Sequence, residues 1–228
     1  MDTDLDFGAL VYCYLAWSGQ SAAMLEGITA GFILSLILYP GTVWLAKVGV
    51  SGSPAQVIAV GAAFWLSSLF WLFIAAPGLM MMAANLSFIQ FGMHLFAAMV
   101  LVYIGVKYFR TRKVERIDDA GSLPAAGALF KTALVQSLAM PMRLPAAMAV
   151  LLATGVYINH PPVSDSLPPI LAGIVIGLTW WWGQFIFLAA CFAKRVPQAI
   201  TIKSLNKIRP FCGVLCLGLA LIVVLLAV

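Results

Sequence analysis

The chain has 228 residues, of which 63% are hydrophobic and only 9% are charged. A soluble domain could not keep so apolar a composition in water, so the sequence indicates an integral membrane protein and excludes the ordinary soluble classes. The net charge of +5 is interpreted as membrane topology, and we expect no nucleic-acid partner. The N-terminus is acidic where a signal peptide would be basic, so no cleaved signal is expected.

Residues 1–24 form a short N-terminal segment that differs from the rest of the chain. Phe7–Trp17 is apolar and aromatic but only about eleven residues long, which is short for a membrane span and typical of an interfacial or re-entrant segment. Two interpretations stay open for this segment: an interfacial helix in the lipid headgroup region, or a docking segment for a partner protein.

The remainder, residues 25–228, is predicted to be one all-α transmembrane domain with six spans. Each apolar stretch is close to or above the ~20 residues that a spanning helix needs. We expect Pro77-Gly78 to end the second span and the proline-rich connection 159–169 to precede the fifth. The six stretches are residues 27–48, 57–75, 88–109, 129–157, 170–192 and 211–228.

The charges predict the orientation of these spans. If the basic loop 110–123 lies in the cytoplasm, the other two basic connections, around Lys47 and over residues 194–209, also lie there. Apart from Arg143, every Lys and Arg then lies on or next to that side. The outer segments carry only acids. We therefore expect a multi-pass protein of the bacterial inner membrane, with the lipid bilayer around it and both termini outside the cytoplasm.

Two of the six spans contain helix breakers at similar depth. Pro40-Gly41 interrupts the first span, and Pro141 with Arg143 interrupts the fourth. Three spans precede the basic loop and three follow it, which predicts two inverted three-helix repeats, over about 25–109 and 124–228. The last span of each half shares a spacing of four and eight residues: Ala97, Leu101 and Gly105 in one, Pro210, Val214 and Gly218 in the other.

On these residues the chain resembles the lysine exporter superfamily, in its homoserine/threonine amino-acid exporter branch. The resemblance covers residues 27–227 and rests on the order and spacing of several short motifs rather than on any one of them. The motifs are Tyr39-Pro40-Gly41-Thr42, Met140-Pro141-Met142 followed by Arg143, Leu101-x-Tyr103-x-Gly105, and Leu205-Asn206-Lys207-Ile208 with Gly218.

The resemblance implies proton-coupled export of a small amino acid or related metabolite. Paired broken helices indicate where a transporter binds its substrate, so we expect the two breaks to meet at mid-membrane. The candidate substrate-binding residues are Tyr39, Pro40, Gly41, Thr42, Gln136, Met140, Pro141, Arg143 and Gln184.

Two ionisable residues inside the spans are singled out. Arg143 either caps carbonyl groups freed by its break or binds an anionic group. No Asp or Glu lies inside any predicted span, so its expected partners are freed carbonyls, Gln136, Gln184 or a bound anion. His94 is a candidate for proton coupling, with a packing role as the alternative.

Other residues are interpreted through packing. Cys212 and Cys216 share a helix face, but packing is favoured over a metal site, and we expect neither a metal nor another cofactor. Gly173, Gly177 and Gly183 are expected to allow close helix approach. The aromatic run Trp180–Trp182, together with residues 1–24, is the expected contact in a homo-oligomer or a larger membrane complex.

Two functional hypotheses from different classes follow. The first is a secondary transporter that exports a small metabolite. The second is a transport-inactive relative that serves as a structural subunit of a larger membrane complex. An enzyme is not expected, since the sequence shows no nucleophile–base pair and no set of metal ligands.

Overall fold

The computed structural model of the chain describes residues 7–37, 39–83, 87–111, 113, 123–140, 142–155, 163–192, 195 and 197–226. Within these ranges the secondary structure is entirely helical, which confirms the predicted all-α class. The helices are α1 (Phe7–Ile37), α2 (Tyr39–Ser51), α3 (Pro54–Ala83), α4 (Ser87–Arg110), α5 (Ala126–Leu138), α6 (Arg143–Ala153), α7 (Val163–Phe192) and α8 (Gln198–Leu226).

The described helices form a multi-pass bundle. Five of them contain segments long and apolar enough to cross a membrane, and the pair α5 and α6 makes a sixth span if it is counted as one bent element. The predicted first span is divided between the second part of α1 and the short helix α2. The described part of the chain therefore has five to six candidate membrane spans, as a multi-pass membrane protein would.

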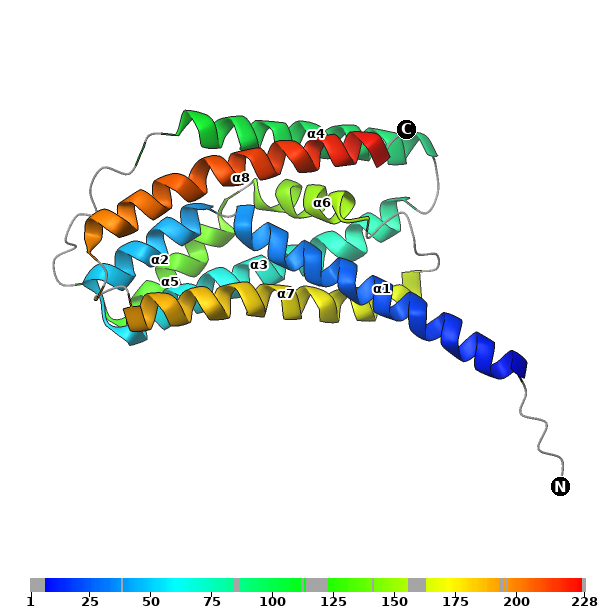
Figure 1. Cartoon of the computed structure of the whole chain (residues 1–228), viewed down its shortest axis with the longest axis horizontal. Helices are drawn as coiled ribbons and strands as arrows, with labels where there is room; N and C mark the ends of the chain where they lie inside the picture. Colours follow the sequence, from blue (N-terminus) through cyan, green and yellow to red (C-terminus); the bar gives the residue numbers. More distant parts are fainter. Residues whose placement is uncertain are drawn as a thin grey trace, which may run out of the picture.

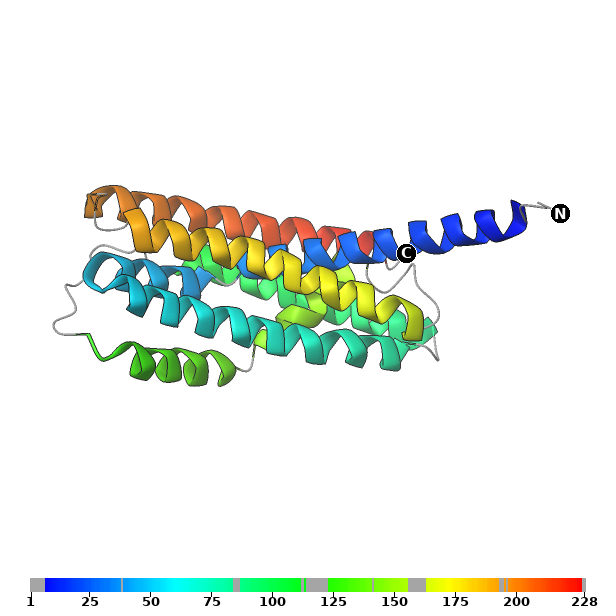
Figure 2. The ribbon, with the colours of Figure 1, turned by 90° about the horizontal axis from the view of Figure 1, so that it is seen from below.

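The two interrupted spans are each divided near the middle of the bundle (Figure 1). Helices α2 and α5 lie in one half along its long axis, whereas α6 and the last turns of α1 lie in the other half. The side view shows α5 at the edge of the bundle, alongside α3 (Figure 2). The breaks predicted from the prolines are therefore real, and they occur at similar depth.

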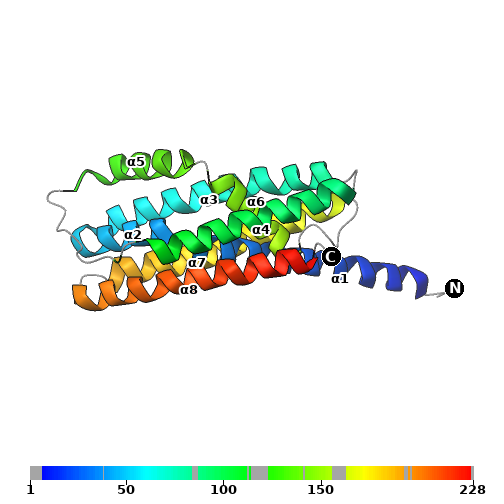
Figure 3. The ribbon, with the colours of Figure 1, turned by 90° about the horizontal axis from the view of Figure 1, so that it is seen from above.

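The helix ends that flank the basic connections lie at one end of the bundle. The turn between α2 and α3, the end of α7, the beginning of α8 and the end of α4 all lie there (Figure 3). The beginning of α1 and the end of α8 lie at the opposite end. This arrangement agrees with an even number of crossings.

Several predicted boundaries are wrong, because helices continue through prolines. Helix α3 passes Pro77 and ends at Ala83, α7 includes Pro168 and Pro169, and α8 includes Pro210 and begins at Gln198. Membrane helices tolerate proline because neighbouring helices and side chains satisfy the backbone groups that it frees. Helix α1 is likewise continuous from Phe7, so residues 7–24 are part of a long first helix rather than a separate one.

Helix α1 packs against α7 more extensively than any other pair of described helices do. A Cβ atom added to Gly177 would overlap the carbonyl oxygen of Ile28, and one added to Gly173 would overlap that of Met24. Glycine on both helices lets the backbones touch, as small residues four apart do in membranes. The glycines at this contact are Gly27, Gly31, Gly173 and Gly177.

The prediction of close approach is confirmed for Gly173 and Gly177 and wrong for Gly183, which has no neighbour within 4 Å of an added Cβ. The residues that share a spacing on α4 and α8 differ in burial. Leu101 of α4 is fully buried, whereas Val214 of α8 is 61% exposed.

Candidate functional site

The first break exposes backbone carbonyl groups that two other helices satisfy. Helix α1 ends at Ile37 and α2 begins at Tyr39, with Pro40 in the first turn of α2, where its missing N–H costs little. The hydroxyl of Tyr108 on α4 donates a hydrogen bond to the carbonyl oxygen of Ile37. The thiol of Cys212 on α8 donates a hydrogen bond to the carbonyl oxygen of Leu36 at 3.2 Å. The break is therefore held by specific donors from α4 and α8.

The second break turns the chain sharply. Helix α5 ends at Leu138, α6 begins at Arg143, and the two helix axes differ by 69°. The backbone N–H of Arg143 donates to the carbonyl oxygen of Met140 at 3.2 Å, which closes a tight turn. Pro141 lies outside the described residues.

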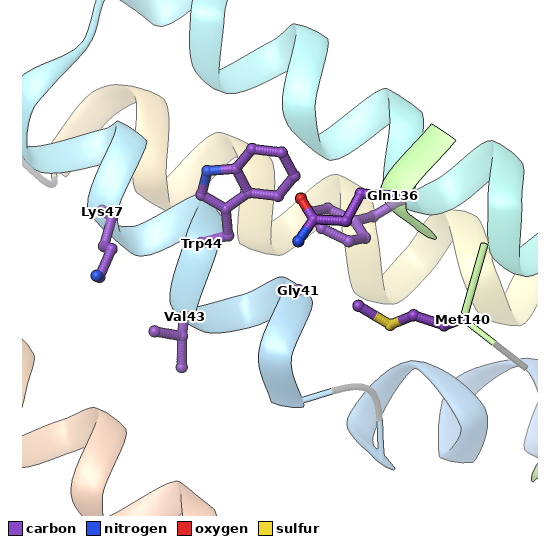
Figure 4. Close-up of a pocket in the computed structure, with 7 residues that line it drawn as sticks. Gly41, Val43, Trp44, Lys47, Gln136 and Met140 are labelled. Atoms are coloured by element: carbon purple, nitrogen blue, oxygen red, sulfur yellow. The ribbon is translucent and has the colours of Figure 1, made fainter. Parts of the chain in front are cut away.

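The two breaks border one cavity of about 380 Å³. Gly41 of the first break, Met140 of the second and Gln136 of α5 all line it, and the Met140 side chain extends toward Gly41 (Figure 4). Side chains from α2 and α3 complete the lining: Val43, Trp44, Lys47 and Phe64. The predicted meeting of the two breaks is therefore seen for these described residues.

Arg143 lies next to this cavity in a buried hydrogen-bond network. Its Nη1 donates to the Oγ of Ser67 on α3 at 2.7 Å, and the hydroxyls of Ser67 and Ser137 are hydrogen-bonded to each other. The guanidinium carbon lies 5.6 Å from the centroid of the Phe64 ring. Arg143 is only 4% exposed, and its Nε has no hydrogen-bond partner among the described residues. Among the described residues, the hydrogen-bond acceptor for Arg143 is therefore the hydroxyl of Ser67. The predicted acceptors were freed carbonyls, Gln136 or Gln184.

Phe64 connects the cavity to Arg143 through an aromatic cluster. Its ring stacks on that of Trp182 of α7 at 5.7 Å and meets that of Trp44 edge-on at 5.6 Å. Trp182 is fully buried, so the cluster is rigidly packed. Because Phe64 both lines the cavity and lies under the guanidinium, it sets the distance between cavity and buried charge.

The other predicted site residues divide into three groups. Thr42 is 3% exposed and lies outside the cavity lining. Gln184 is exposed on α7, away from the cavity. The side chains of Tyr39 and Pro40, like Pro141, lie outside what the structure describes. Gly41, Gln136, Met140 and Arg143 are the predicted residues that the structure brings together.

His94 is buried in α4 with one nitrogen bound and the other free. Its Nδ1 lies 2.8 Å from the carbonyl oxygen of Gln90, and its Nε2 is buried with no hydrogen-bond partner. Since a carbonyl can only accept, Nδ1 carries the proton of the neutral ring and Nε2 carries the lone pair. His94 therefore has a buried ring nitrogen that no described residue hydrogen-bonds.

The tryptophans of α7 point in different directions. Trp180 is 64% exposed, whereas Trp182 is buried against Phe64. Trp180 borders a second, apolar groove of about 600 Å³ between α1 and α7. One of these indoles thus belongs to the core of the site, and another lies on the outer surface.

Sequence reasoning found Gly41 on α2 but missed Trp44 and Lys47 of the same helix and the whole α3 side of the site. Gly41, Trp44 and Lys47 follow one another at three-residue spacing, which places them on one helix face. That spacing could have predicted that Trp44 and Lys47 lie on the same side of the site as Gly41. Phe64 and Ser67 share a face of α3 in the same way, but α3 is apolar all round, so no pattern marks the face that meets Arg143.

Comparison of the chain with protein-family models, with curated proteins and with solved structures finds no match. Fold and site together define a multi-pass helical membrane protein that has a cavity where two interrupted spans meet, with a buried arginine beside it.

Proposed function

We propose that this protein is a secondary transporter of the lysine exporter type, which exports a small amino acid or related metabolite across the bacterial inner membrane. The observation that carries the proposal is the cavity of about 380 Å³ between the two breaks, lined by Gly41 and Met140. Irregular backbone at membrane depth is tolerated where it lines a cavity, and broken helices that meet at mid-membrane are typical of transporter binding sites.

An inverted repeat would give such a site two alternating openings. Helix α1 of the first proposed repeat packs on α7 of the second, and α5 of the second packs on α3 of the first. Helix α4 pairs with α8, and α3 with α7, across the proposed axis. These pairings are what a pseudo-two-fold axis in the membrane plane would produce, and they support two repeats over about 25–109 and 124–228. Rocking of one repeat against the other would then expose the cavity to each side in turn.

His94 is the proposed proton carrier. Its unpartnered Nε2 is buried in α4, and histidine is the side chain whose charge changes most readily near neutral pH. Among the described residues, Glu26 is an acid within the candidate spanning window of α1. The next residue, Gly27, packs against the backbone of Ile170 in the first part of α7. Neither Glu26 nor His94 is among the described residues that line the cavity.

The experiment that tests transport uses purified protein in lipid vesicles loaded with radiolabelled substrates. A panel of amino acids and of their deaminated analogues should show protein-dependent efflux of at least one compound, accelerated by a proton gradient. His94→Gln should retain downhill exchange but lose the acceleration. Vesicles that release no compound faster than empty ones would contradict the proposal.

The proposed orientation, with the basic end in the cytoplasm and both termini outside, gives a labelling prediction. Lys113 is exposed and lies just after the end of α4. Met81 is 73% exposed and lies near the C-terminal end of α3, at the opposite end of the bundle. In a background without native cysteines, Met81→Cys should react with a membrane-impermeant maleimide in intact cells. Lys113→Cys should react only after the cells are permeabilised. Labelling of both residues in intact cells would contradict the orientation.

A second function is favoured by the first part of α1, which projects beyond the end of the bundle (Figure 1). A helix that protrudes in this way suits a structural subunit whose N-terminal residues dock on a partner protein, as does the exposed Trp180.

Deletion of residues 1–19 separates the two functions. The candidate spanning window begins at Gln20, so we expect the shortened protein to insert into the membrane with unchanged thermal stability. If the protein is a transporter, its efflux should also be unchanged. If it is a subunit, polypeptides that copurify with the full chain in mild detergent should be lost. Failure of the shortened chain to insert would show that residues 1–19 belong to the core fold.

A further inference from the structure

The cavity between the breaks has cations beside it and no described acid to balance them. Lys47 lines it directly, and Arg143 lies behind Phe64. The described lining contains no carboxylate. Low-dielectric walls concentrate the field of such charges inside a cleft, so the cavity favours negative charge.

The surroundings of Arg143 point the same way. Within the described part of the chain, its side chain contacts a serine hydroxyl and an aromatic ring, both neutral. A buried charge with neutral partners alone is costly, because neither a hydroxyl nor a ring restores the hydration that burial removes. An anion in the cavity would offset part of that cost through its field, because the guanidinium carbon lies 5.6 Å from the centroid of the cavity-lining Phe64 ring.

The rest of the lining suits an apolar molecular body. Trp44, Phe64, Val43 and Met140 present aromatic and aliphatic surface, and Gln136 adds one amide. A volume of about 380 Å³ is within the range that small-molecule sites occupy. By contrast, the ammonium group of an amino acid would find no described carboxylate in this lining and would be repelled by Lys47.

We infer that the cavity selects a small organic anion. Its carboxylate is held at Lys47, its apolar body lies against Trp44 and Phe64, and the charge of Arg143 behind Phe64 adds to the positive field. The ligand class is thus a carboxylic acid without an ammonium group, rather than a zwitterionic or cationic amino acid. This inference rests on the proposed function only in taking the cavity as the substrate site.

The test uses three ligands of similar shape: 3-phenylpropanoate, L-phenylalanine and phenethylamine. Binding to the purified full-length protein in detergent is measured by isothermal titration calorimetry. We expect 3-phenylpropanoate to bind at least about tenfold more tightly than L-phenylalanine, since one charge-assisted hydrogen bond gained or one like charge avoided contributes on that order. Phenethylamine should not bind.

Matched variants locate the binding. Lys47→Met should weaken the binding of 3-phenylpropanoate by about tenfold. Lys131→Met removes the same charge from an exposed position of α5 outside the cavity lining and should leave binding unchanged. Thermal unfolding of each variant checks that it is folded, and Lys47→Arg, which keeps the charge, should keep the affinity.

The outcomes separate this inference from the transport proposal. Tighter binding of phenylalanine or phenethylamine than of 3-phenylpropanoate, or equal loss in both lysine variants, would overturn the anion selectivity. If the anion selectivity were overturned in this way while vesicles still exported amino acids, the transport proposal would stand and only the anion selectivity would be wrong. Selective binding of 3-phenylpropanoate that depends on Lys47, in a protein that moves no solute, would support the anion site and contradict transport.

Discussion

Gly177→Ala is expected to destabilise the protein by about 1–3 kcal/mol, the usual cost of forcing an extra group into a packed interior. The added Cβ would overlap the carbonyl oxygen of Ile28. Backbone cannot turn aside as a flexible side chain can, so α1 and α7 must move apart. Their separation would weaken the most extensive helix contact of the described structure.

Gly183→Ala on the same helix is the matched control. Nothing lies within 4 Å of its added Cβ, so it should stabilise the protein slightly, by up to about 1 kcal/mol, because alanine favours a helix more than glycine does. The same gain applies at Gly177, so the difference between the two variants reports the helix contact alone. Thermal unfolding of the purified proteins in one detergent measures it. Equal stability of the two variants would contradict the close packing of α1 on α7.

The glycine contact also illustrates what the sequence could predict. The spacing of Gly173 and Gly177 indicates a close helix contact on α7, but it does not name the partner. The partner becomes clear only from the fold, in which Gly27 and Gly31 of α1 have the same four-residue spacing. Pairing between distant segments depends on the whole packing arrangement, and local spacing carries little information about it.

The breaks were predictable because their cause is local. A proline removes a donor at its own position, so Pro40-Gly41 and Pro141 each favour an interruption of the helix. The same rule failed at Pro77 and Pro210, where the helices continue. The outcome at a given proline depends on whether neighbouring helices satisfy the freed backbone groups, which a single sequence does not show.

The site was predictable only in part, for a related reason. The matched depth of the two breaks indicated that they meet, and Gly41 and Met140 do line one cavity. Phe64 and Ser67 were missed because α3 is apolar on every side. In a membrane the lipid-facing surface is as apolar as the interior, so hydrophobic periodicity does not distinguish the buried face of such a helix.

Arg143→Met is expected to abolish transport, lowering efflux by more than about 100-fold, while leaving stability unchanged or slightly raised. Methionine fills much of the same volume without the cost of a buried charge, and replacing buried charge by well-packed apolar groups is often neutral or stabilising. The hydroxyls of Ser67 and Ser137 remain hydrogen-bonded to each other, so each keeps a partner after the substitution. Loss of efflux in a stable protein would assign Arg143 to the substrate.

Ser67→Ala should have the opposite effect on stability. It takes away the hydroxyl that accepts from Arg143 at 2.7 Å and leaves the charge buried, so we expect a loss of about 1.5–3 kcal/mol. Ser68→Ala is the matched control. Ser68 is equally buried on α3, but its hydroxyl donates to the carbonyl oxygen of Phe64 within its own helix at 2.7 Å, a bond whose removal costs little. Vesicle efflux and thermal unfolding are measured together for all three variants. If Arg143→Met proved as destabilising as Ser67→Ala, the arginine would be a brace for the second break, and the proposal that it binds substrate would be wrong.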